Sequence, residues 1–138
     1  MVCVPRPLRF ALIASLLATL PALADPCVAP LPKKGEHFSG FVNYIVDGDG
    51  FCVAPTMDAG GLFQIEVRVA DFYACELHEP GGRAAKENLR KIVFGKFVEC
   101  VAGRKNHDRT IARCTVEGQS VGDVLRRAGT CEGGKGTQ

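Results

Sequence analysis

Apolar and polar positions alternate in the first half of the chain as they do in β-strands. Three stretches show strand-like periodicity, namely residues 38–46, 51–54 and 62–70. Residues 47–50 and 58–61, which are rich in Gly and Asp, separate these stretches and suit tight turns. The pattern therefore predicts three consecutive strands.

The third predicted strand carries two charged residues on one face. Alternation places Val67 on its apolar face and Glu66 and Arg68 together on the opposite face. Two interpretations are open: Arg68 pairs with Glu66 or Glu76 in an ordinary half-buried strand, or it binds an anion in a functional site.

After residue 80 the apolar positions change to a helical spacing. Those on one face are Ala85, Leu89, Ile92 and Val93. They predict an amphipathic helix that Gly95 ends. Residues 96–102 and 110–116 return to strand periodicity, and an S-x-x-D capping pattern predicts a short helix at residues 121–128.

The order of these elements predicts the fold class. Five strands with a helix inserted after the third are typical of a small closed barrel of the OB type. We therefore predict a β-rich α+β fold, a five-stranded OB-like barrel with an inserted helix after strand 3 and a C-terminal helix.

The N-terminal segment has the pattern of a secretory signal peptide. Arg6 and Arg9 precede an apolar stretch at residues 10–20, and residues 22–24 form a small-x-small cleavage motif. An uncleaved membrane anchor is the alternative, but a span needs ~20 apolar residues. We expect cleavage after residue 24, export to the periplasm or the medium, and no stable membrane association afterwards.

The rest of the chain is predicted to hold one domain. Residues 25–37 lack periodicity and form an extended arm, residues 38–131 hold every predicted strand and helix, and residues 132–138 form a Gly-rich flexible tail. We expect a monomer.

Charge is unevenly distributed over this domain. Without Arg6 and Arg9, the chain has 15 basic and 15 acidic residues, so net charge gives no sign of nucleic-acid binding. Residues 25–79 hold 9 acidic and 3 basic residues, whereas residues 80–138 hold 6 and 12. This asymmetry fits a cation site beside a polyanion-binding face, and it fits two solvated surfaces of opposite sign equally well.

Six cysteines remain after the predicted cleavage: Cys27, Cys52, Cys75, Cys100, Cys114 and Cys131. Such a number in a small exported domain predicts up to three disulfides. The predicted hairpin of the last two strands places Cys100 opposite Cys114. Two partners are open for Cys75, namely Cys52 and Cys131.

Three polar features carry candidate chemistry. The turn that contains Asp49 offers carboxylates to a hard cation, Arg68 and Glu76 flank the end of the third strand, and Arg109 begins the fifth strand. Two arginines and a carboxylate beside a metal suit phosphodiester hydrolysis, because charge grows on the phosphoryl oxygens while a water must be deprotonated.

The order and spacing of these motifs resemble the thermonuclease, or staphylococcal nuclease-like, family. Residues 46–49 match its V-x-D-G-D turn, residues 68–76 its R-x-x-x-x-D-x-P-E segment, and residues 108–112 its G-R-x-L-A strand. The resemblance implies an OB-like barrel and an exported nuclease that cleaves DNA or RNA with Ca²⁺.

The resemblance also implies roles for single residues. Arg68 and Arg109 would bind the phosphate, Glu76 would be the general base, and Asp49 would be a Ca²⁺ ligand. Tyr73 stands where the family has its second aspartate ligand, and a phenol is a poor ligand for Ca²⁺.

This replacement leaves two questions open. The ion would be weakly bound, or a substitute such as Asp47 or Asp71 would complete its site. The alternative function is a noncatalytic OB-fold module that binds nucleic acid or a protein partner, with the metal site impaired by Tyr73.

Overall fold

The computed structural model describes residue 2 and residues 25–133. The predicted signal peptide therefore lies almost entirely outside the described residues, as do residues 134–138 of the predicted tail. Neither helix in the described part is long and apolar enough to cross a membrane.

The regular elements follow the predicted order closely. In chain order they are β1 (His37–Ile45), β2 (Gly50–Ala54), the 3-10 helix η1 (Gly61–Phe63), β3 (Ile65–Val69), α1 (Gly82–Val93), β4 (Phe97–Asn106), β5 (Arg109–Val116), β6 (Gln119–Ser120) and α2 (Val121–Arg127). The two-residue strand β6 and the helix η1 were not predicted.

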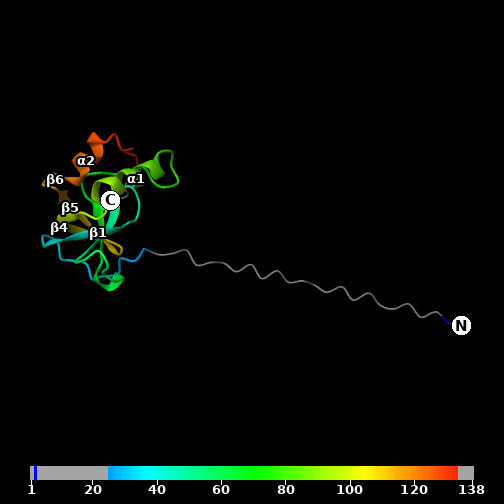
Figure 1. Cartoon of the computed structure of the whole chain (residues 1–138), viewed down its shortest axis with the longest axis horizontal. Helices are drawn as coiled ribbons and strands as arrows, with labels where there is room; N and C mark the ends of the chain where they lie inside the picture. Colours follow the sequence, from blue (N-terminus) through cyan, green and yellow to red (C-terminus); the bar gives the residue numbers. More distant parts are fainter. Residues whose placement is uncertain (1, 3–24, 134–138) are drawn as a thin grey trace.

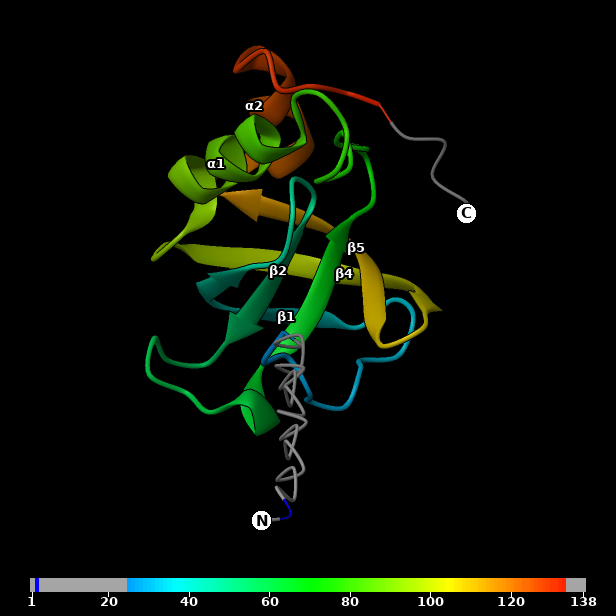
Figure 2. The same cartoon turned by 90° about the vertical axis from the view of Figure 1, so that its right-hand side faces the viewer.

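The strands close into a barrel. Their order in the sheet is β3-β2-β1-β4-β5-β6, and a parallel pairing of β3 with β5 joins the two ends of the five-stranded part. Figure 1 shows the strands gathered beside α1 and α2, and Figure 2 shows both helices side by side across one end of the strands. The predicted OB-like barrel with its two helices is confirmed.

The core explains why these segments take these forms. Val67 and Val69 on the inner face of β3 are fully buried, as is Leu89 on the apolar face of α1. Ser120 begins α2, where its hydroxyl accepts a hydrogen bond from the Asp123 N–H at 3.4 Å. The apolar faces that predicted β3 and α1 are therefore the faces that pack in the core.

The β4–β5 hairpin is longer than predicted. We predicted a polar loop over residues 103–109, but β4 runs to Asn106, β5 begins at Arg109, and only His107 and Asp108 lie between them. Strand pairing uses backbone groups, so it continues through polar residues whose side chains point to water. His107 has φ of 58°, the left-handed conformation that a tight turn needs.

Three disulfides connect the described cysteines: Cys27–Cys52, Cys75–Cys131 and Cys100–Cys114. The predicted bridge between Cys100 and Cys114 is confirmed, because these residues face each other across β4 and β5 with Cα atoms 4.1 Å apart. Cys75 pairs with Cys131, since Cys27 of the arm takes Cys52 instead.

Candidate functional site

The candidate site lies on the face of β3 that is turned away from the core. Glu66 and Arg68 lie on this face, yet they are only 4% and 7% exposed. Strand β3 has β2 on one side and β5 on the other, so its side chains are flanked by both. Gly50 pairs with Arg68, and a Cβ atom at this position would lie only 2.8 Å from Asp47 Oδ1.

The Arg68 guanidinium is held between a carboxylate and an aromatic ring. Its Nε lies 3.9 Å from Asp49 Oδ2, and its Cζ lies 5.2 Å from the centre of the Tyr73 ring. The same Nε is buried and has no hydrogen-bond partner among the described residues. A buried donor without a hydrogen-bond partner costs about 1–3 kcal/mol, and the Asp49 carboxylate 3.9 Å away compensates part of this cost.

Asp49 is fixed in the turn between β1 and β2. Its Oδ2 accepts a hydrogen bond from the Ala74 N–H at 3.0 Å, and its own N–H donates to Asp47 Oδ1 at 3.1 Å. Burial, and then the nearby charge of Asp47, raises the pKa of Asp49 to about 7, although the Ala74 N–H and Arg68 act in the opposite direction. Burial therefore outweighs the stabilisation that Arg68 and the Ala74 N–H give to the charged form of Asp49.

The free energy of unfolding should decrease as the pH rises, because of the Asp49 carboxylate. Its pKa is higher in the folded protein than the ordinary value of 3.8, so its contribution to stability is fully present below that value and is lost as the pH rises through about 7. In buffer with chelator, Asp49→Asn should show a smaller decrease in unfolding free energy than wild type between about pH 5 and about pH 8. Urea unfolding of both proteins at several pH values measures these decreases in unfolding free energy. Equal decreases in both proteins would contradict the assignment, and the exposed Asp58→Asn is the matched control.

Arg109 is the first residue of β5 and lies next to β3. The parallel register pairs Val67 with Thr110, which places Arg109 near Glu66. Burial, followed by the charges of Asp25 and Asp108, raises the pKa of Glu66 to about 7, and Arg109 partly offsets the rise. The two predicted phosphate-binding arginines therefore lie on neighbouring strands.

Glu76 makes no hydrogen bond or ion pair with these residues in the described part of the chain. It is exposed in the segment between β3 and α1, directly after the Cys75–Cys131 bridge. Its N–H donates to Glu79 Oε2 at 2.8 Å. Within the described part of the chain, no hydrogen bond or ion pair joins its carboxylate to either arginine, so the carboxylate is free to meet a ligand from solvent.

Asp71, a candidate substitute ligand, contacts α2 instead of Asp49. Its Oδ2 accepts a hydrogen bond from the Ser120 hydroxyl at 2.7 Å, and its backbone carbonyl accepts one from Arg126. Asp71 also lines a concavity of about 560 Å³ against β1, β4 and β5, which includes none of the four predicted site residues. Among the alternatives for a second metal ligand, this leaves Asp47, which lies beside Asp49.

Two members of the site were not predicted from the sequence. Glu66 was noted only as a strand neighbour of Arg68, and Asp25 only as the start of the arm. Alternation gave a signal for Glu66, since it shares a face with Arg68. No local pattern indicates that Asp25 approaches this face, because that approach depends on the Cys27–Cys52 bridge.

The arrangement suits the binding of an anion with oxygen atoms. A guanidinium donates paired N–H groups to phosphate or carboxylate oxygens, and a carboxylate whose pKa is near 7 exchanges a proton or a metal ion readily at neutral pH. No protein-family model matches this chain, and a search of curated proteins finds no similar sequence.

Proposed function

We propose that the protein is an exported nuclease that hydrolyses phosphodiester bonds of DNA or RNA with the help of Ca²⁺. The observation that carries the proposal is the buried Arg68, whose Nε has no hydrogen-bond partner and lies 3.9 Å from Asp49. Fixed positive charge next to a carboxylate supports binding of phosphate together with a cation. The three disulfides fit the oxidising compartment that export implies.

Each residue has a separate role in this proposal. Arg68 and Arg109 bind the phosphoryl oxygens and stabilise the charge that develops on them. Glu76, exposed in the segment between β3 and α1, orients and deprotonates the attacking water. The preorganised cations do not have to rearrange during the reaction, which is the usual source of such stabilisation.

The acidic turn offers the oxygen ligands that Ca²⁺ prefers. Asp49 and Asp47 offer carboxylate oxygens, and burial, followed by the charge of Asp47, raises the pKa of Asp49 to about 7. These two residues would hold the ion together with waters, and a bound Ca²⁺ would supply further stabilisation of negative charge on the phosphate.

A noncatalytic module is the second candidate function. The Tyr73 ring lies against Arg68, where a second carboxylate would strengthen a calcium site, and the Glu76 carboxylate has no partner that positions it among the described residues. The same face would then bind nucleic acid or a protein partner without cleaving it.

Incubating the protein with plasmid DNA and with RNA, in Ca²⁺ and in chelator, tests the proposal. We expect cleavage that requires Ca²⁺, and we expect Arg68→Lys or Arg109→Lys to lower kcat/KM by roughly 10- to 100-fold, because lysine keeps the charge but loses the planar fork. Arg104→Lys, at an exposed position of β4, is the matched control.

The outcomes separate the two candidates. Full activity in both arginine variants would move the reaction to another site. A wild-type protein that retards a labelled oligonucleotide without cleaving it would support the noncatalytic module instead.

A further inference from the structure

Three carboxylates from distant parts of the chain converge beside β3. Asp25 belongs to the arm, Glu66 to β3, and Asp108 to the turn between β4 and β5. Each offers one oxygen, and these oxygens all lie within 4.8 Å of one another. Two oxygens that each lie about 2.4 Å from one Ca²⁺ ion can be at most about 4.8 Å apart, so the three fit a shared ion.

Glu66 is the buried member of this acidic triad. It is 4% exposed, and its Oε2 is buried without a hydrogen-bond partner among the described residues. A buried carboxylate without a partner for one oxygen, on a residue that lies beside two further carboxylates, is unfavourable unless a cation or donor compensates it. This unpartnered oxygen is an observation independent of the clustering, and it indicates a missing ligand.

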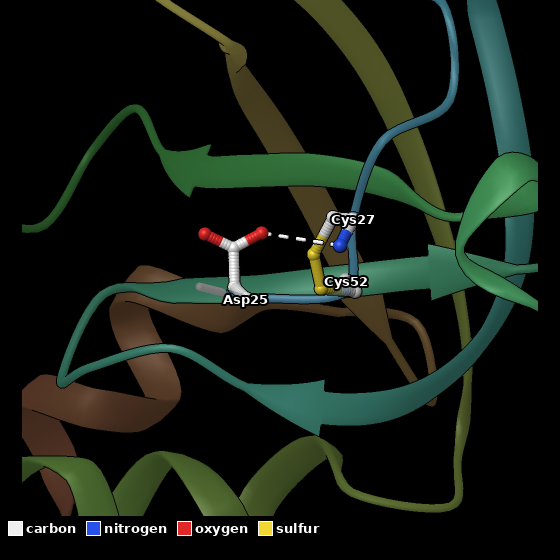
Figure 3. A group of neighbouring side chains, drawn as sticks. All are labelled: Asp25, Cys27 and Cys52. Carbon is white, nitrogen blue, oxygen red and sulfur yellow. Dashed lines mark hydrogen bonds between the residues drawn. A yellow bond between two sulfur atoms is a disulfide. The ribbon is translucent and has the colours of Figure 1, made fainter. Parts of the chain in front are cut away.

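The arm is fixed where it brings Asp25 to Glu66. Cys27 is bridged to Cys52, and Cys52 pairs directly with Glu66 between β2 and β3. Figure 3 shows one oxygen of Asp25 directed at the Cys27 N–H, 3.1 Å away, and the other oxygen directed away from the disulfide. Because both sulfurs are bonded to each other, they provide no thiolate ligand, and the carboxylate is the donor that remains.

Asp108 opens the triad to solvent. It is exposed, whereas Asp25 is half-buried. The turn that carries it is held by the pairing of Asn106 with Arg109, so its position is set by the hairpin. Asp108 is therefore the member of the triad that meets an ion from solvent first.

We propose that Asp25, Glu66 and Asp108 bind a divalent cation that links the arm, β3 and the β4–β5 turn. Carboxylate ligands select a hard ion, and Ca²⁺ fits better than Mg²⁺ because ligands from three separate segments suit its variable geometry. Asp49 is not part of this group of oxygens, so the triad is a site separate from the acidic turn. The proposal does not depend on nuclease activity.

Calorimetric titration of the full chain with CaCl₂ tests the site. The protein is produced with its own N-terminal segment in a compartment that forms disulfides, and mass spectrometry determines its N-terminus. We expect Glu66→Gln and Asp108→Asn each to weaken Ca²⁺ binding by roughly 10-fold or more, because ligand charge sets the affinity of oxygen sites. The exposed Asp58→Asn should bind as wild type does.

Two further measurements make the result decisive. Asp49→Asn should retain the binding event that Glu66→Gln loses, which separates the triad from the acidic turn. Ca²⁺ should raise the Tm of wild type more than that of Asp108→Asn, whose exposed side chain can be changed without disturbing the core.

Several outcomes would overturn the proposal. One is a wild-type protein that binds no Ca²⁺ at millimolar concentration, as expected if the α-ammonium of a chain cleaved before Asp25 compensates Glu66 instead. Another is unchanged affinity in Asp108→Asn. Unchanged affinity in Asp108→Asn has no bearing on nucleic-acid cleavage, whereas a complete lack of Ca²⁺ binding would also contradict the Ca²⁺ dependence proposed for that cleavage.

Discussion

Glu76→Gln is expected to lower kcat for nucleic-acid cleavage by roughly 10²-fold or more, the scale of a positioned general base. Glutamine has nearly the same shape but cannot accept the proton of the attacking water. Within the described residues the Glu76 carboxylate makes no hydrogen bond or ion pair, so the substitution removes no contact of the folded protein. Initial rates on one DNA substrate at saturating Ca²⁺ measure the effect, and thermal unfolding checks that the fold is intact.

Glu79→Gln is the matched control for this experiment. Glu79 lies in the same segment, and its Oε2 accepts a hydrogen bond from the Glu76 N–H. A glutamine keeps an oxygen that can accept this bond, so the segment should keep its conformation and the enzyme its rate. If Glu76→Gln cleaves as fast as wild type, Glu76 is not the base, and another carboxylate or a metal-bound water must take that role.

Local periodicity was enough to predict the barrel. Val67 and Val69 alternate with charged residues. Leu89 belongs to a set of apolar residues at helical spacing. Each pattern reflects burial of one face of one element, which is a property of adjacent residues. The pairing of Cys100 with Cys114 was predictable for the same reason, since both lie in one hairpin.

The surroundings of Arg68 could not be predicted in this way. Alternation turns Glu66 and Arg68 away from the core and so suggests exposure, yet both are buried. Their burial comes from distant segments. Strand β5 closes the barrel beside them, and the arm reaches Glu66 through the bridge of Cys27 to Cys52. Six cysteines allow 15 connectivities, and periodicity does not choose among them.

The segment that carries Glu76 is likewise held by a disulfide between distant parts of the chain. The resemblance to the thermonuclease family aligned Glu76 with a general base, but the family's proline is replaced here by Cys75, which is bonded to Cys131. The segment that carries Glu76 is therefore held by the C-terminal end of the domain. Its Cys75 N–H also donates to the Cys131 carbonyl at 3.0 Å, and Gly133 N–H donates to the Tyr73 carbonyl at 3.2 Å.

Removing this bridge with Cys75→Ala/Cys131→Ala is expected to lower the unfolding free energy by about 4 kcal/mol, because the cross-link restricts a long loop in the unfolded chain. The two cysteines are separated by 56 positions, against 14 for Cys100–Cys114, so loop entropy predicts the larger effect for the former. Urea unfolding of both double variants measures the two free energies.

The same variant connects stability with activity. Without the bridge, the segment of Glu76 keeps only backbone hydrogen bonds to the C-terminal end, and local opening becomes easier. We expect kcat to fall in Cys75→Ala/Cys131→Ala under conditions where the protein is still folded. In Cys100→Ala/Cys114→Ala, which removes a bridge five positions along β5 from Arg109, kcat should stay near that of wild type. An unchanged kcat in the first variant would mean that the disulfide stabilises the fold without positioning Glu76, because the segment would then hold its geometry through the backbone contacts alone.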